Sequence, residues 1–205
     1  FAGWYTKILG PVLKDEGKLY VTHPSPTFYS EAFAPVRGVA GLEEVEEIAW
    51  GAPFTGGTPF FASGEWDVEP VDLVVTFRNY HNFSRDPPMA VNKSSFDALK
   101  PGGLYGIVDH TRRHMEADGP ENGRRVDPVL VIKEVQEAGF RFVDYSPALR
   151  RPDDELRYEV GRQSVTGNSD RFSLLFMKPP SALIGAPPTV PADLMLPRHQ
   201  TRYNE

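Results

Sequence analysis

The segment VDLVVTFRNYHNF, residues 71–83, contains the clearest strand in the chain and decides its fold class. Its first part is an apolar, β-branched run, which is typical of a strand buried in a sheet. The polar cluster RNYHNF, residues 78–83, follows directly. Because ligands bind at the carboxyl ends of strands in open α/β sheets, we expect this cluster to lie at a functional edge.

Predicted helices and further short apolar strands alternate along the rest of the chain. The strands are expected at 18–22, 104–110, 140–146 and 171–179. The helices are expected at 4–13, through 95–99 and at 128–138, with an acidic helical candidate at 41–49. This alternation predicts an α/β sheet whose strands are mainly parallel.

The helix at 128–138 has the most complete signals. Asp127 is a good N-cap residue, Pro128 suits the first helical position, and Gly139 is a helix stop. Apolar side chains recur at helical spacing, at Val131, Ile132, Val135 and Ala138. An amphipathic helix is therefore expected here.

Composition excludes several classes of protein. The 205 residues carry a formal net charge of −6, with 40% hydrophobic and 24% charged residues. These values are typical of one globular domain and argue against a general nucleic-acid binder, which needs basic excess to neutralise phosphates. Cysteine is absent, so disulfides, thiolate zinc sites and cysteine nucleophiles are excluded.

No apolar stretch approaches the roughly 20 residues that a membrane span requires. We expect a cytoplasmic protein. The alternative is export after removal of an N-terminal signal that is not present in this chain.

Six segments resemble one known family in their order and spacing. They are GWYTKIL (3–9), DLVVTFRNYHNF (72–83), ALKPGGLYGIVDH (98–110), DPVLVIKEVQEAGFRFVDYS (127–146), ALRRPDDE (148–155) and DRFSLLFMKP (170–179). The set resembles predicted bacterial class I S-adenosylmethionine-dependent methyltransferases, over residues 1–179. The resemblance implies a doubly wound, mainly parallel Rossmann-like α/β sheet with an antiparallel C-terminal hairpin. It also implies an N-terminally incomplete fold, which lacks the family's first strand, normally at the sheet centre beside the fourth. Residues 180–205 are expected to form a proline-rich extended tail.

The resemblance places S-adenosylmethionine beside the start of the chain. In the family a glycine-rich turn precedes the first helix, and only Gly3 of that turn is present here, so the cofactor-binding residues are expected to be Gly3, Trp4, Tyr5 and Thr6. Many class I methyltransferases bind the ribose with an acidic residue after the second strand. His23 is the cofactor-binding candidate at that place, with Ser25 beside it. A turn and a polar loop without a ligand are the alternative interpretation.

Two polar clusters are expected to face the reaction crevice. Arg78 and Asn79 are predicted to bind the cofactor. His81, Asp109 and His110 are predicted to be catalytic, because a histidine with an ordinary pKa of about 6.5 can deprotonate a nucleophile. Packing by Tyr80 and capping by Asn79 are the structural alternatives.

The loops beyond these strands carry further charges. Four arginines are candidates to attract an anionic group, namely Arg112, Arg113, Arg124 and Arg125. Hydrogen bonds that stabilise the loops are the structural alternative for them. The run ALRRPDDE is expected to be solvated or paired locally. His110 and His114 are four residues apart, but this spacing brings two side chains together only on a helix, so we predict no metal.

The resemblance implies methyl transfer from S-adenosylmethionine to an oxygen, nitrogen or sulfur nucleophile of a small molecule. The expected partners exclude nucleic acid, and the tail leaves open a homo-oligomer or a partner chain. A different class of function is the alternative: a methyltransferase-like structural or partner-binding subunit that has lost cofactor binding. A nicotinamide-dependent oxidoreductase has less support, because the KPGG context favours methyl transfer.

Overall fold

The computed structural model describes residues 3–13, 15, 17–23, 34–42, 45–49, 66–83 and 89–181. Nearly all of the predicted tail, residues 180–205, lies outside this set. Within the described residues, no helix has the length and apolar character needed to cross a membrane.

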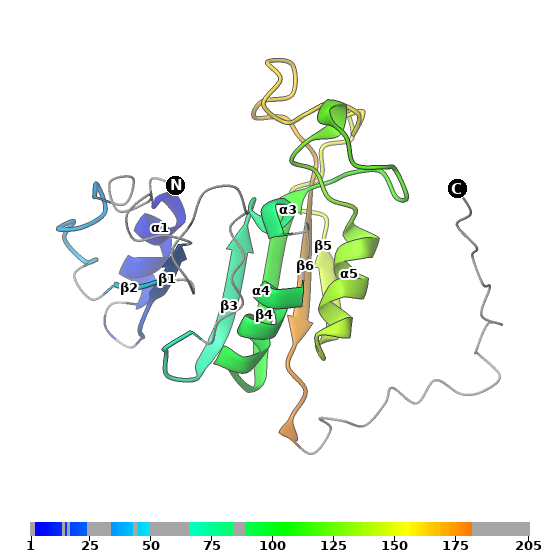
Figure 1. The fold of residues 1–205 in the computed structure, drawn as a ribbon. Helices are drawn as coiled ribbons and strands as arrows, with labels where there is room; N and C mark the ends of the chain where they lie inside the picture. The colour runs from blue at the N-terminus through cyan, green and yellow to red at the C-terminus, as the bar shows by residue number, and fades with distance from the viewer. Residues whose placement is uncertain are drawn as a thin grey trace, which may run out of the picture.

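In the described part of the chain, six strands form two sheets (Figure 1). In the first sheet, β1 (Tyr20–His23) pairs in parallel with β2 (Glu46–Ala49). The second sheet has the order β3-β4-β6-β5, with β3 at Val71–Phe77, β4 at Leu99–His110, β5 at Arg141–Ser146 and β6 at Arg171–Met177. β3 and β4 are parallel, whereas β6 is antiparallel to both β4 and β5. The α/β fold class with an antiparallel C-terminal hairpin is therefore confirmed.

Each of β1 and β3 pairs with one strand only among the described residues. The resemblance expects the family's first strand at the sheet centre beside the fourth, which corresponds to β3. Among the described residues, no strand pairs with the other edge of β3. Leu73 and Val75 of β3 are 54% and 37% exposed, although the apolar sequence of this strand predicts burial.

The core lies where helices cover the second sheet. α4 (Met89–Ala98) and α5 (Pro128–Glu137) contact each other, α4 packs on β4, and α5 packs on β5 and β6 (Figure 1). The largest fully buried apolar side chains here include Tyr105, Ile107, Phe176, Val131 and Val135. Full burial of one such side chain contributes about 1.5–3 kcal/mol, so packing of these residues stabilises β4, β6 and α5 together.

The predicted helix at 128–138 is confirmed as α5. Asp127 caps it by accepting a hydrogen bond from the Val129 N–H at 2.8 Å. Gly139 has a φ of 104°, a left-handed conformation that glycine adopts without strain.

The predicted helix at 4–13 is also confirmed, as α1 (Trp4–Leu13), and Pro11 lies within it. Gly10 allows Leu42 to pack against the helix, since a Cβ at this position would lie only 2.1 Å from the Leu42 Cδ2 atom. α1 therefore packs on the chain before β2.

The helical candidate at 41–49 was wrong, because residues 46–49 form strand β2. Glutamate-rich segments favour helices by propensity, but tertiary pairing overrides it here. β2 aligns Glu46 with Tyr20 and Ile48 with Thr22, Ile48 is buried, and Lys18 forms an ion pair with Glu46 at 2.8 Å. Burial of one face and pairing with β1 therefore decide the conformation.

Leu99 opens β4 rather than ending the preceding helix, and β4 includes the KPGG turn expected before it. The β3 and β4 register shifts at this point, between Val71 and Leu73, and Gly102 has a φ of 82°. The short α3 (Tyr80–Phe83) and the 3-10 helix η1 (Pro120–Asn122) complete the described helices.

Candidate functional site

The carboxylate of Asp109 is fully buried at the end of β4 and joins two histidines. Its Oδ1 accepts a hydrogen bond from the His110 N–H at 2.7 Å, and its Oδ2 accepts one from the His81 N–H at 2.8 Å. The His81 Nδ1 atom lies 2.8 Å from Oδ1. Because backbone donors already bind both oxygens, the carboxylate acts as an acceptor and the His81 Nδ1–H is the donor.

This pairing fixes the tautomer of His81. With the proton on Nδ1, the lone pair of the neutral imidazole is on Nε2. The His81 side chain is only 8% exposed, so its ring is held in a defined orientation. A histidine oriented by a buried carboxylate is the arrangement that general bases use in hydrolytic triads.

His110 has a different environment, although it was predicted to share the catalytic role. Arg78 Nε–H donates to its Nε2 at 3.2 Å, so the proton of the neutral ring is on Nδ1, which lies 2.8 Å from the Ser169 hydroxyl oxygen. Burial lowers the pKa of His110 to about 4; Asp109 opposes this shift, and Arg78, His81 and Arg171 add to it. His110 is thus a neutral ring with both nitrogens engaged.

Arg78 and Asn79 connect β3 to α3. Arg78 has a φ of 53°, and its N–H donates to the Val108 carbonyl oxygen at 2.7 Å. A left-handed conformation at a non-glycine residue costs energy and is concentrated at functional sites. Asn79 accepts a hydrogen bond from the Asn82 side chain at 2.7 Å.

The residues predicted to bind the cofactor at the start of the chain lie close to β3. Gly3 has a φ of 61°, and α1 begins directly after it. Tyr5 stacks on Phe77, the last residue of β3, with ring centroids 4.1 Å apart. Thr6 is buried and Trp4 is 66% exposed. His23 ends β1, and its side chain lies outside the described set.

Tyr80 belongs to the core rather than to the crevice. Its hydroxyl donates to Glu134 at 3.0 Å and accepts from Asn92 at 2.8 Å, and its side chain is fully buried. Burial raises the pKa values of both Tyr80 and Glu134. The packing interpretation of Tyr80 is therefore confirmed.

The four loop arginines bind partners within the protein. Arg112 pairs with Asp118, Arg113 donates to the Glu155 carbonyl oxygen, Arg124 pairs with Glu159, and Arg125 binds Asp154. These contacts agree with the structural alternative, in which the guanidinium groups stabilise the loops, and the attraction of an anion stays a prediction.

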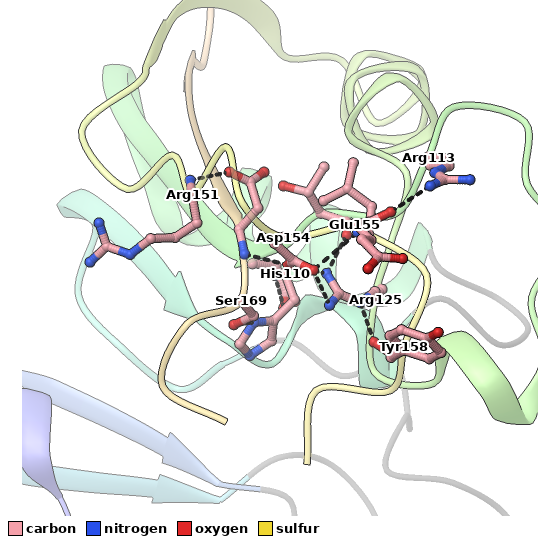
Figure 2. A network of polar contacts seen from close by, with 12 residues as sticks. His110, Arg113, Arg125, Arg151, Asp154, Glu155, Tyr158 and Ser169 are labelled. Carbon is pink, nitrogen blue, oxygen red and sulfur yellow. Dashed lines mark hydrogen bonds and ion pairs between the residues drawn. The ribbon is translucent and has the colours of Figure 1, made fainter. Parts of the chain in front are cut away.

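Asp154 joins these loops. The charged run ALRRPDDE did not by itself predict this role. Arg125 binds both of its oxygens, at 2.8 and 3.0 Å, and also donates to the carbonyl oxygens of Tyr158 and Thr111 (Figure 2). Asp154 further accepts from the Asp170 N–H at 2.6 Å, directly after Ser169. The network thereby positions Ser169 against His110.

Sequence reasoning therefore missed Asp154, Ser169 and Arg171. Each lies far along the chain from the strand whose end it contacts, and none stands in a motif with a mechanism of its own. Among the residues that the structure describes, no three histidines or acidic residues gather in a way that could hold a metal ion.

Comparisons with known proteins bear on the fold. No family model and no curated protein sequence matches the chain. Solved structures do match, and one is a SAM-dependent methyltransferase from Aquifex aeolicus, with a TM-score of 0.58 and 17% identity over 86% of this chain and 77% of that one. The chain has the class I methyltransferase fold.

Two further solved structures match over similar lengths. N-methyltransferase NodS from Bradyrhizobium japonicum WM9 has a TM-score of 0.52 and 15% identity, over 87% of this chain and 81% of that one. The [4+2]-cyclase SpnF has a TM-score of 0.58 and 14% identity, over 87% of this chain and 72% of that one. Since one of these proteins is a cyclase, the fold alone does not decide the reaction.

Loss of the Asp154 charge is expected to destabilise the domain strongly. The side chains of Arg125 and Asp154 are 0% and 5% exposed, so Asp154→Asn leaves a buried guanidinium without its counter-charge. We expect the free energy of unfolding to fall by about 3–5 kcal/mol, measured by urea denaturation. The neighbouring exposed Asp153→Asn is the control and should change it by less than about 0.5 kcal/mol. Equal effects of the two variants would contradict the assigned role.

The low pKa of His110 predicts a pH dependence of stability. Folding favours the neutral ring, with a pKa of about 4 against about 6.5 in the unfolded chain. Between these values the unfolded state binds more protons, so the free energy of unfolding should fall as pH is lowered from about 6.5 to about 4. His110→Gln should remove this part of the slope, and NMR of the ring should give a midpoint near 4. A midpoint near 6.5 would refute the neutral assignment.

Proposed function

We propose that the protein binds S-adenosylmethionine and transfers its methyl group to an oxygen, nitrogen or sulfur nucleophile of a small molecule, with His81 as the general base. The observation that carries the proposal is the pairing of His81 with the buried Asp109 at the carboxyl edge of β3 and β4. The methyltransferase fold supports it, since this edge is where ligands meet in open α/β sheets.

The start of the chain fits the methionine end of this cofactor. The Lys7 N–H donates to the Gly3 carbonyl oxygen at 3.0 Å, so the helical ladder of α1 begins at Gly3. The N–H groups of Trp4, Tyr5 and Thr6 therefore lack acceptors within the helix and are suited to bind a carboxylate. Tyr5, through its stacking on Phe77, links this helix start to the end of β3. His23 and Asn79 would complete the cofactor site.

The cofactor, when bound, supplies a methyl group on a positively charged sulfur. The protein then has to orient the acceptor for an in-line displacement and remove a proton where the nucleophile needs it. His81 Nε2 accepts that proton, and Asp109 stabilises the imidazolium that forms. His110 acts as a positioning residue, because Arg78 and Ser169 bind its two nitrogens.

Cofactor binding is tested first by calorimetry with S-adenosylhomocysteine. We expect a micromolar dissociation constant. Gly3→Ala should weaken binding at least tenfold, because a Cβ strains the φ of 61° at the start of α1. Ile8→Ala on the exposed face of the same helix is the control and should bind normally. No binding by the folded wild-type protein would favour the alternative, a non-catalytic subunit.

The base is tested with His81→Asn, whose amide N–H can replace Nδ1–H as donor to Asp109 while Nε2 is lost. We expect the methylation rate to fall by about 10²–10⁴-fold, with binding of S-adenosylhomocysteine unchanged. The rate is measured as S-adenosylhomocysteine release over a panel of phenols, amines and thiols. A variant as active as the wild type would exclude His81 as the base.

A further inference from the structure

Two arginines beside His110 have no carboxylate partner among the described residues. They are Arg78 at the end of β3 and Arg171 at the start of β6. The Nε atom of Arg171 is buried and has no hydrogen-bond acceptor. The loop arginines Arg112, Arg124 and Arg125 differ, since each forms an ion pair with an acidic side chain.

The sheet places these two guanidinium groups around one neutral ring. His110 is directly opposite Arg171 in the antiparallel register of β4 and β6, so their Cβ atoms are about 5 Å apart. Arg78 contacts the same ring and donates to its Nε2 at 3.2 Å. Its left-handed backbone, at φ 53°, turns the chain away from β3 and toward α3.

The nearby carboxylates are already bound by other groups, and that of Asp170, next to Arg171, accepts from the Arg151 N–H at 2.6 Å. Asp109 is the other nearby carboxylate, and His81 and two backbone N–H groups already bind it. His110 itself is a neutral ring and adds no charge of either sign. Arg78 and Arg171 both lower the pKa of His110, so both positive charges act at this ring, and an anion that binds both is stabilised.

We propose that Arg78 and Arg171 bind an anionic oxygen group, a carboxylate or a phosphate, on the methyl acceptor. This inference rests on the proposed function and specifies the substrate class of the same site. The ring centroids of His81 and His110 are 6.1 Å apart. An acceptor held by its anionic end next to His110 presents a nucleophile to His81 if the two groups are separated by about the width of one aromatic ring or a short carbon chain.

Arginine Nε–H signals in ¹H–¹⁵N NMR spectra test the proposal without requiring turnover. Sodium benzoate and phenyl phosphate are the anionic probes, and benzamide is the neutral match of benzoate. We expect saturable shifts of the Arg78 and Arg171 signals with one or both anions and none with benzamide. Arg141 is the internal control, because it is exposed and pairs with the opposite end of β6, at Met177. Tighter binding of benzoate would identify the anionic group of the acceptor as a carboxylate, and tighter binding of phenyl phosphate would identify it as a phosphate.

Variants sharpen the test. Arg78→Gln and Arg171→Gln should each weaken anion binding at least tenfold, whereas Arg141→Gln should leave it unchanged. If Arg171→Gln does not fold, Arg171→Lys, which keeps the charge, replaces it in the test. Equal shifts with benzoate and benzamide, or shifts of all exposed arginines in proportion to concentration, would overturn the proposal. Displacement of the anion by S-adenosylhomocysteine would also overturn it, since the arginines would then bind the cofactor.

The titration is run with and without S-adenosylhomocysteine, so that its result is independent of the proposed function. Failure of the proposed function is seen in the calorimetry as a lack of cofactor binding. Failure of the present inference is seen in the anion titration alone.

Discussion

The buried carboxylate of Asp109 is the constraint on which the site depends. A charge with no solvent exposure is tolerated only when its oxygens are fully bonded, and three donors from two segments bind them. Two of these donors belong to His81, so the carboxylate fixes both the backbone and the ring of that residue. The third donor is the His110 N–H, which ties the end of β4 to the same point. The start of α3 and the end of β4 therefore form one rigid unit.

A second layer of buried charge holds the other side of the site. Arg125 and Asp154 join the loop after β4 to the loop before β6, and Asp154 binds the Asp170 N–H beside Ser169. The Arg125 guanidinium and the backbone N–H groups of Asp170 and Leu156 outweigh burial, and the pKa of Asp154 lies below its ordinary value. The orientation of His110 thus depends on residues more than forty positions away, through Ser169.

The elements that the sequence predicted well are those whose signals are local. The β-branched run of β3 and the capped helix α5 contain their own start, stop and periodicity. Strand β2 was missed, because its conformation comes from pairing with β1 rather than from its glutamates. For the site, position after a strand was enough to bring His81, Asp109 and His110 to one edge. It was not enough to separate their roles, since those follow from Ser169 and Arg78, whose contacts only the folded sheet creates.

The polar residues at the carboxyl ends of β3 and β4 bear on the type of reaction, which the fold alone does not decide. SpnF has a similar fold and is a [4+2]-cyclase, and a cycloaddition needs no net proton transfer. A histidine held in one tautomer by a buried carboxylate is useful chiefly where a proton has to be removed. Methyl transfer to an O–H, N–H or S–H group releases a proton, whereas ring formation by cycloaddition does not. The pair formed by His81 and Asp109 therefore supports the proposed transfer to a nucleophile that carries a proton.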